Sequence, residues 1–229
     1  MASRIVFLPT AQEEVALFTE HLVSFNWVPG MAISQGTKSV LNLHAAARVE
    51  LGIDRILEIS TRSPEHFGIS LSAFNLQVEV SDKLVSVEVA YQSSKVFSDG
   101  GPYLDLLNGS SMDAKQDLRL KTSGDLREFK FEENRWPLNS NPNFYDYLYM
   151  RGLLNNPNSN KLLDYEAFTD IAFNQNRSAR SGKKSFNCQA RSAAIYCSLL
   201  NRMKENQALD FLLDLSKTEA EKPEQLGLF

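Results

Sequence analysis

The chain has few cysteines and histidines for its 229 residues. Its two cysteines, Cys188 and Cys197, fall within one predicted helix, where their spacing turns them away from each other. We therefore expect free thiols in a reducing compartment, such as the cytoplasm. The three histidines show no ligand spacing with each other or with cysteine, so no metal site is expected.

The sequence also lacks a long hydrophobic run. No apolar stretch approaches the roughly 20 residues that span a membrane. The opening residues, MASRIVFLPTAQEE, do not show the basic region and apolar block of a secretory signal. Hydrophobic residues make up 43% of the chain and charged residues 23%, which is typical of a globular protein with a substantial core. We expect a cytoplasmic protein with no membrane partner.

Acidic residues are absent from residues 171–204, although the chain as a whole carries a net charge of −4. The loop NQNRSARSGKKS within this block concentrates four basic residues: Arg177, Arg180, Lys183 and Lys184. Two interpretations stay open, a solvated loop followed by a basic helix face, or a loop that binds the phosphates of a nucleic acid or dinucleotide. The SGKKS portion is not a Walker A motif, because the required earlier glycine is missing.

Hydrophobic periodicity predicts a mixture of helices and strands. Helices are expected over residues 12–26, 38–49, 87–98, 143–154 and 187–205, the last capped by Asn187. Strands are expected over 55–60 and 68–80, with a turn at Ser81 and Asp82, and a strand or mixed segment over 161–174. With no repeat and no evident linker, these elements predict a single, helix-rich α+β domain with a small β component.

Residues 84–103, LVSVEVAYQSSKVFSDGGPY, carry an unusual polar stripe. Glu88, Tyr91, Gln92 and Lys95 stand at i, i+3, i+4 and i+7, which is one face of a helix. Ser86 is a suitable N-cap, and the sequence Gly-Gly-Pro is expected to end the helix. From these residues alone, the stripe is either an exposed Glu–Lys pair or the wall of an active site.

Two other residues can be interpreted in two ways. Asp170 lies between apolar residues in FTDIAFN, so it is either a cap or a buried carboxylate with a shifted pKa that suits acid–base chemistry. Trp136, which precedes a proline, is more often a core residue than a platform for stacking.

The segment SVEVAYQSSKVF resembles the signature of the NADAR superfamily, which is linked to NAD and ADP-ribose. Further segments follow in that family's order: LSAFN (71–75), AKQDLR (114–119), the Trp136 region, AFTDIAFN (167–174) and NCQARSAAIYCSLL (187–200). The resemblance covers roughly residues 55–203. The extended N-terminus and the wording GGPY and FNCQARS look most like the bacterial branch paired with DarT-type DNA ADP-ribosyltransferase toxins.

This resemblance implies a NADAR/YbiA-like fold and a hydrolase that removes ADP-ribose from guanine bases in DNA. It implies three parts: an N-terminal helical extension packed on the core (1–54), a catalytic domain (55–215) and a flexible C-terminal tail (216–229). Glu88 and Asp170 become the expected catalytic carboxylates, with Glu88 as the acid, and Lys95 either a nucleophile or a ligand of the diphosphate. The expected substrate-binding residues are Ser72, Phe74, Asn75, Tyr91, Gln92, Trp136 and Phe173. Phe173 departs from other branches, which carry tryptophan there. Neither cofactor nor metal is implied.

The expected partners are ADP-ribosylated DNA, held by Arg177, Arg180, Lys183 and Lys184, and the cognate toxin as a functional pair. The ending EQLGLF resembles the pentapeptide with which bacterial proteins dock on the replication sliding clamp. A hydrophobic end that folds back on the core is the alternative for this segment. The residues that would dock are Gln225, Leu226, Leu228 and Phe229.

Two other functions stay open. One is an N-glycosidase of small riboflavin-pathway metabolites, and the other is a non-enzymatic module that binds ADP-ribose or the toxin. An extended basic surface favours DNA over a small metabolite.

Overall fold

The computed structural model describes residues 1–138, 143–173 and 187–220, and for 205–206 and 215–220 it describes the backbone. Its largest sheet has four strands in the order β2-β1-β9-β3. The strands are β1 (Ala2–Pro9), β2 (Phe18–Phe25), β3 (Ile56–Glu58) and β9 (Ala167–Thr169). β1 is antiparallel to both neighbours, whereas β3 and β9 run parallel. The helix predicted over residues 12–26 is therefore wrong, since β2 occupies this region.

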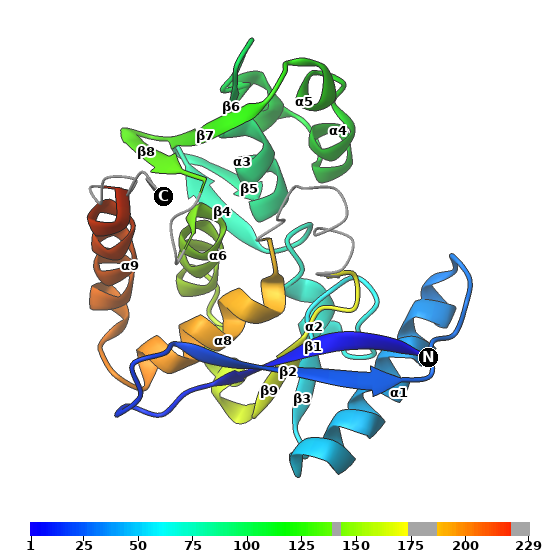
Figure 1. Cartoon of the computed structure of the whole chain (residues 1–229). Helices are drawn as coiled ribbons and strands as arrows, with labels where there is room; N and C mark the ends of the chain where they lie inside the picture. The colour runs from blue at the N-terminus through cyan, green and yellow to red at the C-terminus, as the bar shows by residue number, and fades with distance from the viewer. Residues whose placement is uncertain (139–142, 174–186, 221–229) are drawn as a thin grey trace, which may run out of the picture.

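Helices lie on both sides of this sheet (Figure 1), and alternating residues along its strands face these two layers. On one face Val6 packs with Leu43 of α1 (Ile33–Leu51). On the other face Phe7 and Phe168 join the larger core, which contains α8 (Gln189–Leu200). The predicted helix over 38–49 is confirmed as part of α1, and the strand over 55–60 is confirmed as β3.

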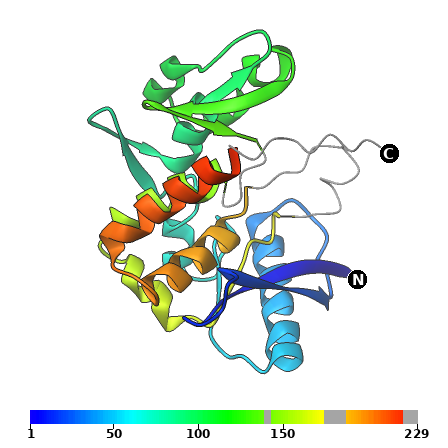
Figure 2. The ribbon, with the colours of Figure 1, turned by 60° about the vertical axis from the view of Figure 1, so that its left-hand side comes forward.

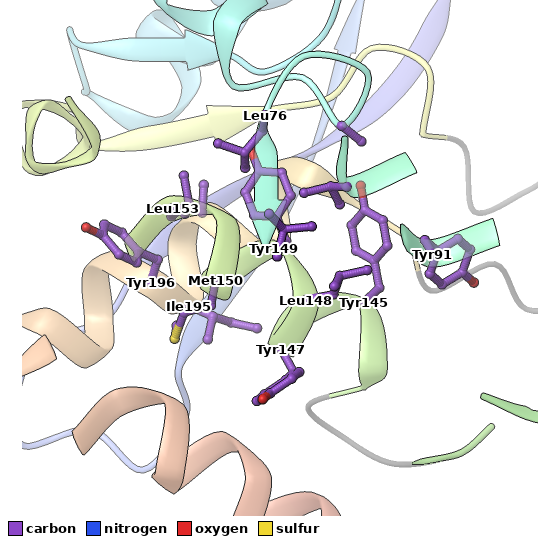
Figure 3. Packing of buried hydrophobic residues seen from close by; sticks show 14 of the residues in the cluster. Leu76, Tyr91, Tyr145, Tyr147, Leu148, Tyr149, Met150, Leu153, Ile195 and Tyr196 are labelled. Carbon is purple, nitrogen blue, oxygen red and sulfur yellow. The ribbon is translucent and has the colours of Figure 1, made fainter. Parts of the chain in front are cut away.

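The helix α6 (Phe144–Leu154) lies at the centre of the larger core and contacts both α8 and α9 (Glu205–Ala220). Asn143 caps it by accepting a hydrogen bond from the Asp146 backbone, as a helix starting at this position requires. The fully buried Asp146 carboxylate in turn forms a 2.5 Å ion pair with Arg191 of α8. Figure 3 shows the tyrosines of α6 within this cluster, and the Tyr149 hydroxyl donates to the Leu71 carbonyl at 2.7 Å. The predicted aromatic helix is thus confirmed. The predicted cap of α8 is wrong by one residue, because Cys188 occupies the N-cap position.

A second part of the molecule lies at the end opposite α1 (Figure 2). The hairpin β4 (Gln77–Val80) and β5 (Lys83–Ser86) turns at Ser81 and Asp82, whose φ values of 49° and 64° confirm the predicted turn. It leads into α3 (Val87–Ser93) and then into β6 (Lys95–Phe97). β6 forms a sheet with β7 (Leu126–Phe131) and β8 (Asn134–Pro137).

The helix predicted over residues 87–98 starts where expected but ends early. Its C-cap is Ser94, and Lys95 already pairs with Phe129 in the β6–β7 ladder. The strand predicted over 68–80 is correct only in its last part, because the short helix α2 precedes β4. The remaining short helices are α2 (His66–Ser70), η1 (Leu104–Asn108), α4 (Ser111–Gln116), α5 (Arg119–Thr122) and η2 (Ser159–Asp164).

The architecture confirms the predicted α+β class. The N-terminal segment contains two strands as well as α1, and β1 lies between β2 and β9 in the main sheet. At the other end α9 continues through the expected start of the tail as far as Ala220. Both cysteines are buried free thiols, as predicted. Within the described residues, no helix has the length and apolar character required to cross a membrane.

Candidate active site

The start of α3 sets the position of the polar stripe. The Ser86 hydroxyl accepts from the Val89 backbone at 3.2 Å and so caps the helix. The Glu88 backbone donates to the Ala73 carbonyl at 2.9 Å, which fixes α3 to the preceding loop. Glu88 and Gln92 are each only 8% exposed. The polar stripe therefore faces the interior and is not an exposed ion-pair face.

Gln92 connects Glu88 to Lys95 through its side-chain amide. The Gln92 Nε2 donates to Glu88 Oε1 at 3.0 Å, and the Lys95 Nζ donates to Gln92 Oε1 at 2.7 Å. Lys95 has left the helix, yet its side chain returns to the stripe and its Nζ lies 4.9 Å from the centre of the Tyr91 ring. The structure thus brings together all four residues that the sequence placed on this stripe.

The Lys95 amine has an unusual acidity. Burial lowers its pKa to about 8, because the charged form loses water; the Glu88 charge opposes this shift and Lys115 adds to it. With a pKa of about 8, about a tenth of the amine is neutral at pH 7. An ordinary lysine would be neutral in only about one molecule in a few thousand. Lys95 is therefore a candidate nucleophile as well as a candidate cation.

Asp170 approaches the same region from the end of β9. Its carboxylate accepts from the Ala172 backbone and from Gln189 Nε2 of α8, both at 3.1 Å. Burial raises its pKa, and these hydrogen bonds oppose the shift. Gln189 Oε1 accepts from the Ala73 backbone at 2.5 Å, so the loop that holds Glu88 also holds the partner of Asp170.

Tyr145 of α6 lies within the electrostatic reach of both Glu88 and Asp170. Burial raises the pKa of its phenol, and the charges of Tyr149, Glu88 and Asp170 each add to the shift. Its ring meets Tyr91 edge-on at 5.3 Å, and Figure 3 shows the two rings side by side. The Tyr91 hydroxyl hydrogen-bonds to the Asn187 side chain. The sequence placed Tyr145 within the predicted helix over 143–154, and that pattern gave no signal of a position near two acids.

The structure also reveals a buried carboxylate that sequence reasoning missed. Glu58 of β3 is fully buried and accepts hydrogen bonds from Ser60, Thr169 and the Ile171 backbone. Burial, together with the nearby Asp170 charge, raises its pKa to about 8. In the sequence Glu58 is a glutamate within the predicted strand RILEIS. Because glutamates are seldom fully buried, the sequence offered no reason to place it in the interior.

The other predicted substrate-binding residues differ in their surroundings. Ser72 is 1% exposed, and its hydroxyl finds no hydrogen-bond partner among the described residues. The Lys115 Nζ lies over Phe74, 4.6 Å from the centre of its ring. Asn75 is exposed, and its side chain donates to the Ile69 carbonyl. Phe173 is partly buried beside Phe7.

Trp136 lies deep in the core, 1% exposed, between the rings of Phe144 and Tyr147. This placement matches the core interpretation of the residue, and its role in binding stays a prediction. The four basic loop residues and the four clamp-motif residues lie outside the described residues. No group of three or more potential metal ligands occurs in the part of the chain that the structure describes.

These features define a class of protein: an α+β domain with a buried Glu–Gln–Lys chain beside two tyrosines, one of which also feels the charge of a second buried carboxylate, Asp170. Such a set suits acid–base and nucleophilic chemistry. Residues 2–224 match the family described as DarT1-associated NADAR antitoxin, and the chain belongs to this family. The match extends well beyond the segment 55–203 expected from the motifs and includes β1, β2 and α1. None of the curated proteins compared with the chain matches it.

Proposed function

We propose that the protein is an ADP-ribosyl hydrolase that removes ADP-ribose from guanine bases in DNA. It would act as the antitoxin by reversing the modification made by a DNA ADP-ribosyltransferase toxin. The observation that carries the proposal is the buried Glu88–Gln92–Lys95 chain of hydrogen bonds in a member of an antitoxin family. A module that only occluded the toxin would have no need of a buried lysine with a lowered pKa.

The substrate is an N-glycoside, so cleavage requires a proton for the leaving guanine nitrogen. The sequence favoured Glu88 for this role. Burial favours Asp170, because its raised pKa keeps a proton available nearer neutral pH. In our scheme Asp170 donates that proton while the bonding electrons of the C1–N bond leave with the nitrogen.

Lys95 then has a defined part in the reaction. Its neutral amine donates one hydrogen to Gln92 and keeps its lone pair for the anomeric carbon. Attack forms a C1–Nζ bond, and Glu88 takes the amine proton and passes it to the ring oxygen as the C1–O bond of the sugar ring breaks, which gives an imine. Addition of water to the imine places oxygen on C1, restores the Lys95 amine and releases ADP-ribose. The substrate is proposed to be held by the binding residues expected from the sequence: Tyr91, Gln92, Ser72, Phe74, Asn75, Trp136 and Phe173.

The test is a guanine-ADP-ribosylated oligonucleotide, from which the protein is expected to regenerate plain DNA and free ADP-ribose. Replacing Glu88→Gln should slow turnover about 10²- to 10⁴-fold while binding of the modified oligonucleotide persists. The exposed Glu79→Gln is the matched control and should behave as the unaltered protein. Release from a modified protein but not from DNA would refute the proposal. Toxin neutralisation that survives Glu88→Gln without loss would favour a non-enzymatic module.

Two further partners belong to this proposal. The basic residues Arg177, Arg180, Lys183 and Lys184 would hold DNA phosphates, and Gln225, Leu226, Leu228 and Phe229 would dock on the sliding clamp. A variant without the last five residues that binds the clamp as well as the full chain would refute the docking. A riboflavin-pathway metabolite is the alternative substrate, and its release would have to exceed that from modified DNA to replace the proposal.

A further inference from the structure

The carboxylate of Glu58 lies on the opposite face of the main sheet from Asp170. Along β3, Ile56 packs toward α1 and Leu57 toward the larger core, so Glu58 points again toward α1. Asp170 meets Gln189 of α8, on the other face. Glu58 therefore supports the candidate site from behind, out of reach of the substrate.

The hydrogen bonds of Glu58 hold the chain on both sides of Asp170. Thr169 Oγ1 donates to Glu58 Oε2 at 2.6 Å, and the Ile171 backbone donates to Glu58 Oε1 at 2.9 Å. The Ile59 backbone adds a bond to the Thr169 carbonyl at 2.8 Å. Asp170 is thus fixed through its two sequence neighbours, at the point where β9 has ended and no strand pairing holds it.

His44 of α1 completes this network from the N-terminal segment. Its Nε2 lies 2.8 Å from Thr169 Oγ1. Because that hydroxyl donates its hydrogen to Glu58, the imidazole must donate to the hydroxyl when Glu58 is ionised. Burial, with the charge of Arg48, lowers the pKa of His44 to about 4, so the ring is neutral.

The same three groups also fit a protonated Glu58. In that state Glu58 donates to Thr169 Oγ1, which donates to Nε2 of the other His44 tautomer. All three groups keep a partner in either state, so Glu58 can change its charge without breaking the network. The titratable and charged groups around it are Asp170 beyond β9 and His44 on α1, with Arg48 acting on His44 from one turn along that helix.

We infer that Glu58 is a positioning residue for Asp170, holding its backbone from both sides and placing a second carboxyl group behind it, with His44 of the N-terminal segment completing the support. This inference rests on the proposed function for the role of Asp170 as proton donor. It also gives α1 a part in the site, since His44 connects this helix to the hydrogen bonds around Asp170.

The test compares the pH dependence of oligonucleotide hydrolysis in the unaltered protein, Glu58→Gln and Glu166→Gln. Glu58→Gln keeps an acceptor for Ile171 but removes one of two interacting carboxyl groups, so Asp170 no longer shares with a neighbour the proton that the pair loses last, at about pH 8. The alkaline limb of the profile should then move to lower pH. Glu166→Gln is the matched control, since its exposed carboxylate holds the Asp54 and Arg55 backbones beside the same strands. Its limb should not move. A folded Glu58→Gln whose limb stays in place overturns the inference.

A second measurement does not depend on activity or on the folding of the Glu58 variant. In protein with ¹³C-labelled carboxyl groups, Glu58 should titrate at a lower pH in Asp170→Asn than in the unaltered protein, because a neighbouring negative charge is gone. An unchanged Glu58 titration refutes the coupling. If the unaltered protein releases no ADP-ribose from DNA, the proposed function fails, and this titration still decides whether the two carboxyl groups act on each other.

Discussion

The backbone of Lys95 lies in strand β6, but its side chain contacts residues of helix α3. Its backbone pairs with Phe129 in β6, while its amine returns to Gln92 and lies over Tyr91. Burial would favour the neutral amine, and Glu88 opposes it, so the pKa of about 8 is the balance of these two effects. Since this value is below the ordinary 10.5, the neutral form increases as pH rises through about 8.

Replacing Lys95→Arg separates the two roles that the sequence left open. Arginine keeps the positive charge and can bind a diphosphate, but it has no amine that could form an imine. We expect turnover to fall by about 10²-fold or more while binding of ADP-ribose stays within about tenfold. The unaltered enzyme should also gain activity as pH rises toward about 8.

Borohydride trapping provides the direct readout for Lys95. Reduction during turnover should add the mass of reduced ADP-ribose to a peptide that contains Lys95, and the Lys95→Arg protein should remain unmodified. Lys115→Arg is the control, because this neighbour lies over Phe74 and should leave trapping intact. Full turnover in Lys95→Arg without any trapped adduct would make Lys95 a phosphate ligand.

The residues of the polar stripe could be predicted because their contacts are local. Glu88, Gln92 and Lys95 are neighbours along one short segment, and their spacing indicates the same face before any fold is known. Glu58 could not be predicted in this way, because its partner Thr169 is 111 positions away in the sequence. Only the pairing of β3 with β9 makes the two meet.

At the scale of elements, α3 is a short helix whose position depends on its start. Ser86 caps it and also bonds with Ser111 of α4 at 2.6 Å, while Ser111 donates to the Phe74 carbonyl. The cap therefore links α3, α4 and the loop before β4. All three border the candidate site.

Replacing Ser86→Ala should lower the free energy of unfolding by about 1 kcal/mol, because the Val89 amide loses its acceptor. Turnover should fall as well, since Glu88 and Gln92 stand on this helix. Ser110→Ala removes a comparable cap from α4, at an exposed position, and should lower stability without an effect on turnover. Denaturant unfolding and oligonucleotide hydrolysis measure the two effects. Equal losses of turnover in both variants would contradict a specific role for the α3 cap.

The N-terminal strands show why periodicity failed for one element. Val15 and Leu22 contributed to the helical spacing over residues 12–26, yet both are exposed in the structure. Among the described strands β2 is an edge strand that pairs with β1 alone, and only Val23 and Phe25 in it are buried. These residues form a strand because they pair with β1, and no local sequence pattern indicates that pairing. The helices α6 and α8 were predictable because the cores they enter require apolar residues along most of their length.

At the scale of the whole molecule, charge is unevenly distributed. The chain carries a net charge of −4, but residues 171–204 contain no acidic residue, and this block begins one residue after Asp170. On the far side of the block, Gln189 holds the Asp170 carboxylate and Asn187 bonds Tyr91. The described residues on the two sides of the basic loop, Asp170 and Gln189, therefore contact each other at the candidate site.

Variants of the basic loop residues can therefore test DNA binding separately from cleavage of the glycosidic bond. Replacing Arg177, Arg180, Lys183 and Lys184 together by alanine should weaken binding of a modified oligonucleotide and flatten its salt dependence. Each lost phosphate contact lowers the slope of log K against log salt by about 0.7 for single-stranded DNA. Binding of free ADP-ribose should stay unchanged, since the contacts proposed for it lie in the described site. The control with equal loss of charge is replacement of four exposed lysines outside this loop, Lys38, Lys83, Lys130 and Lys161, which should leave most of the slope. If the loop variant binds DNA with the original slope, phosphates are held elsewhere, and the choice of DNA over a small metabolite would lose its main support.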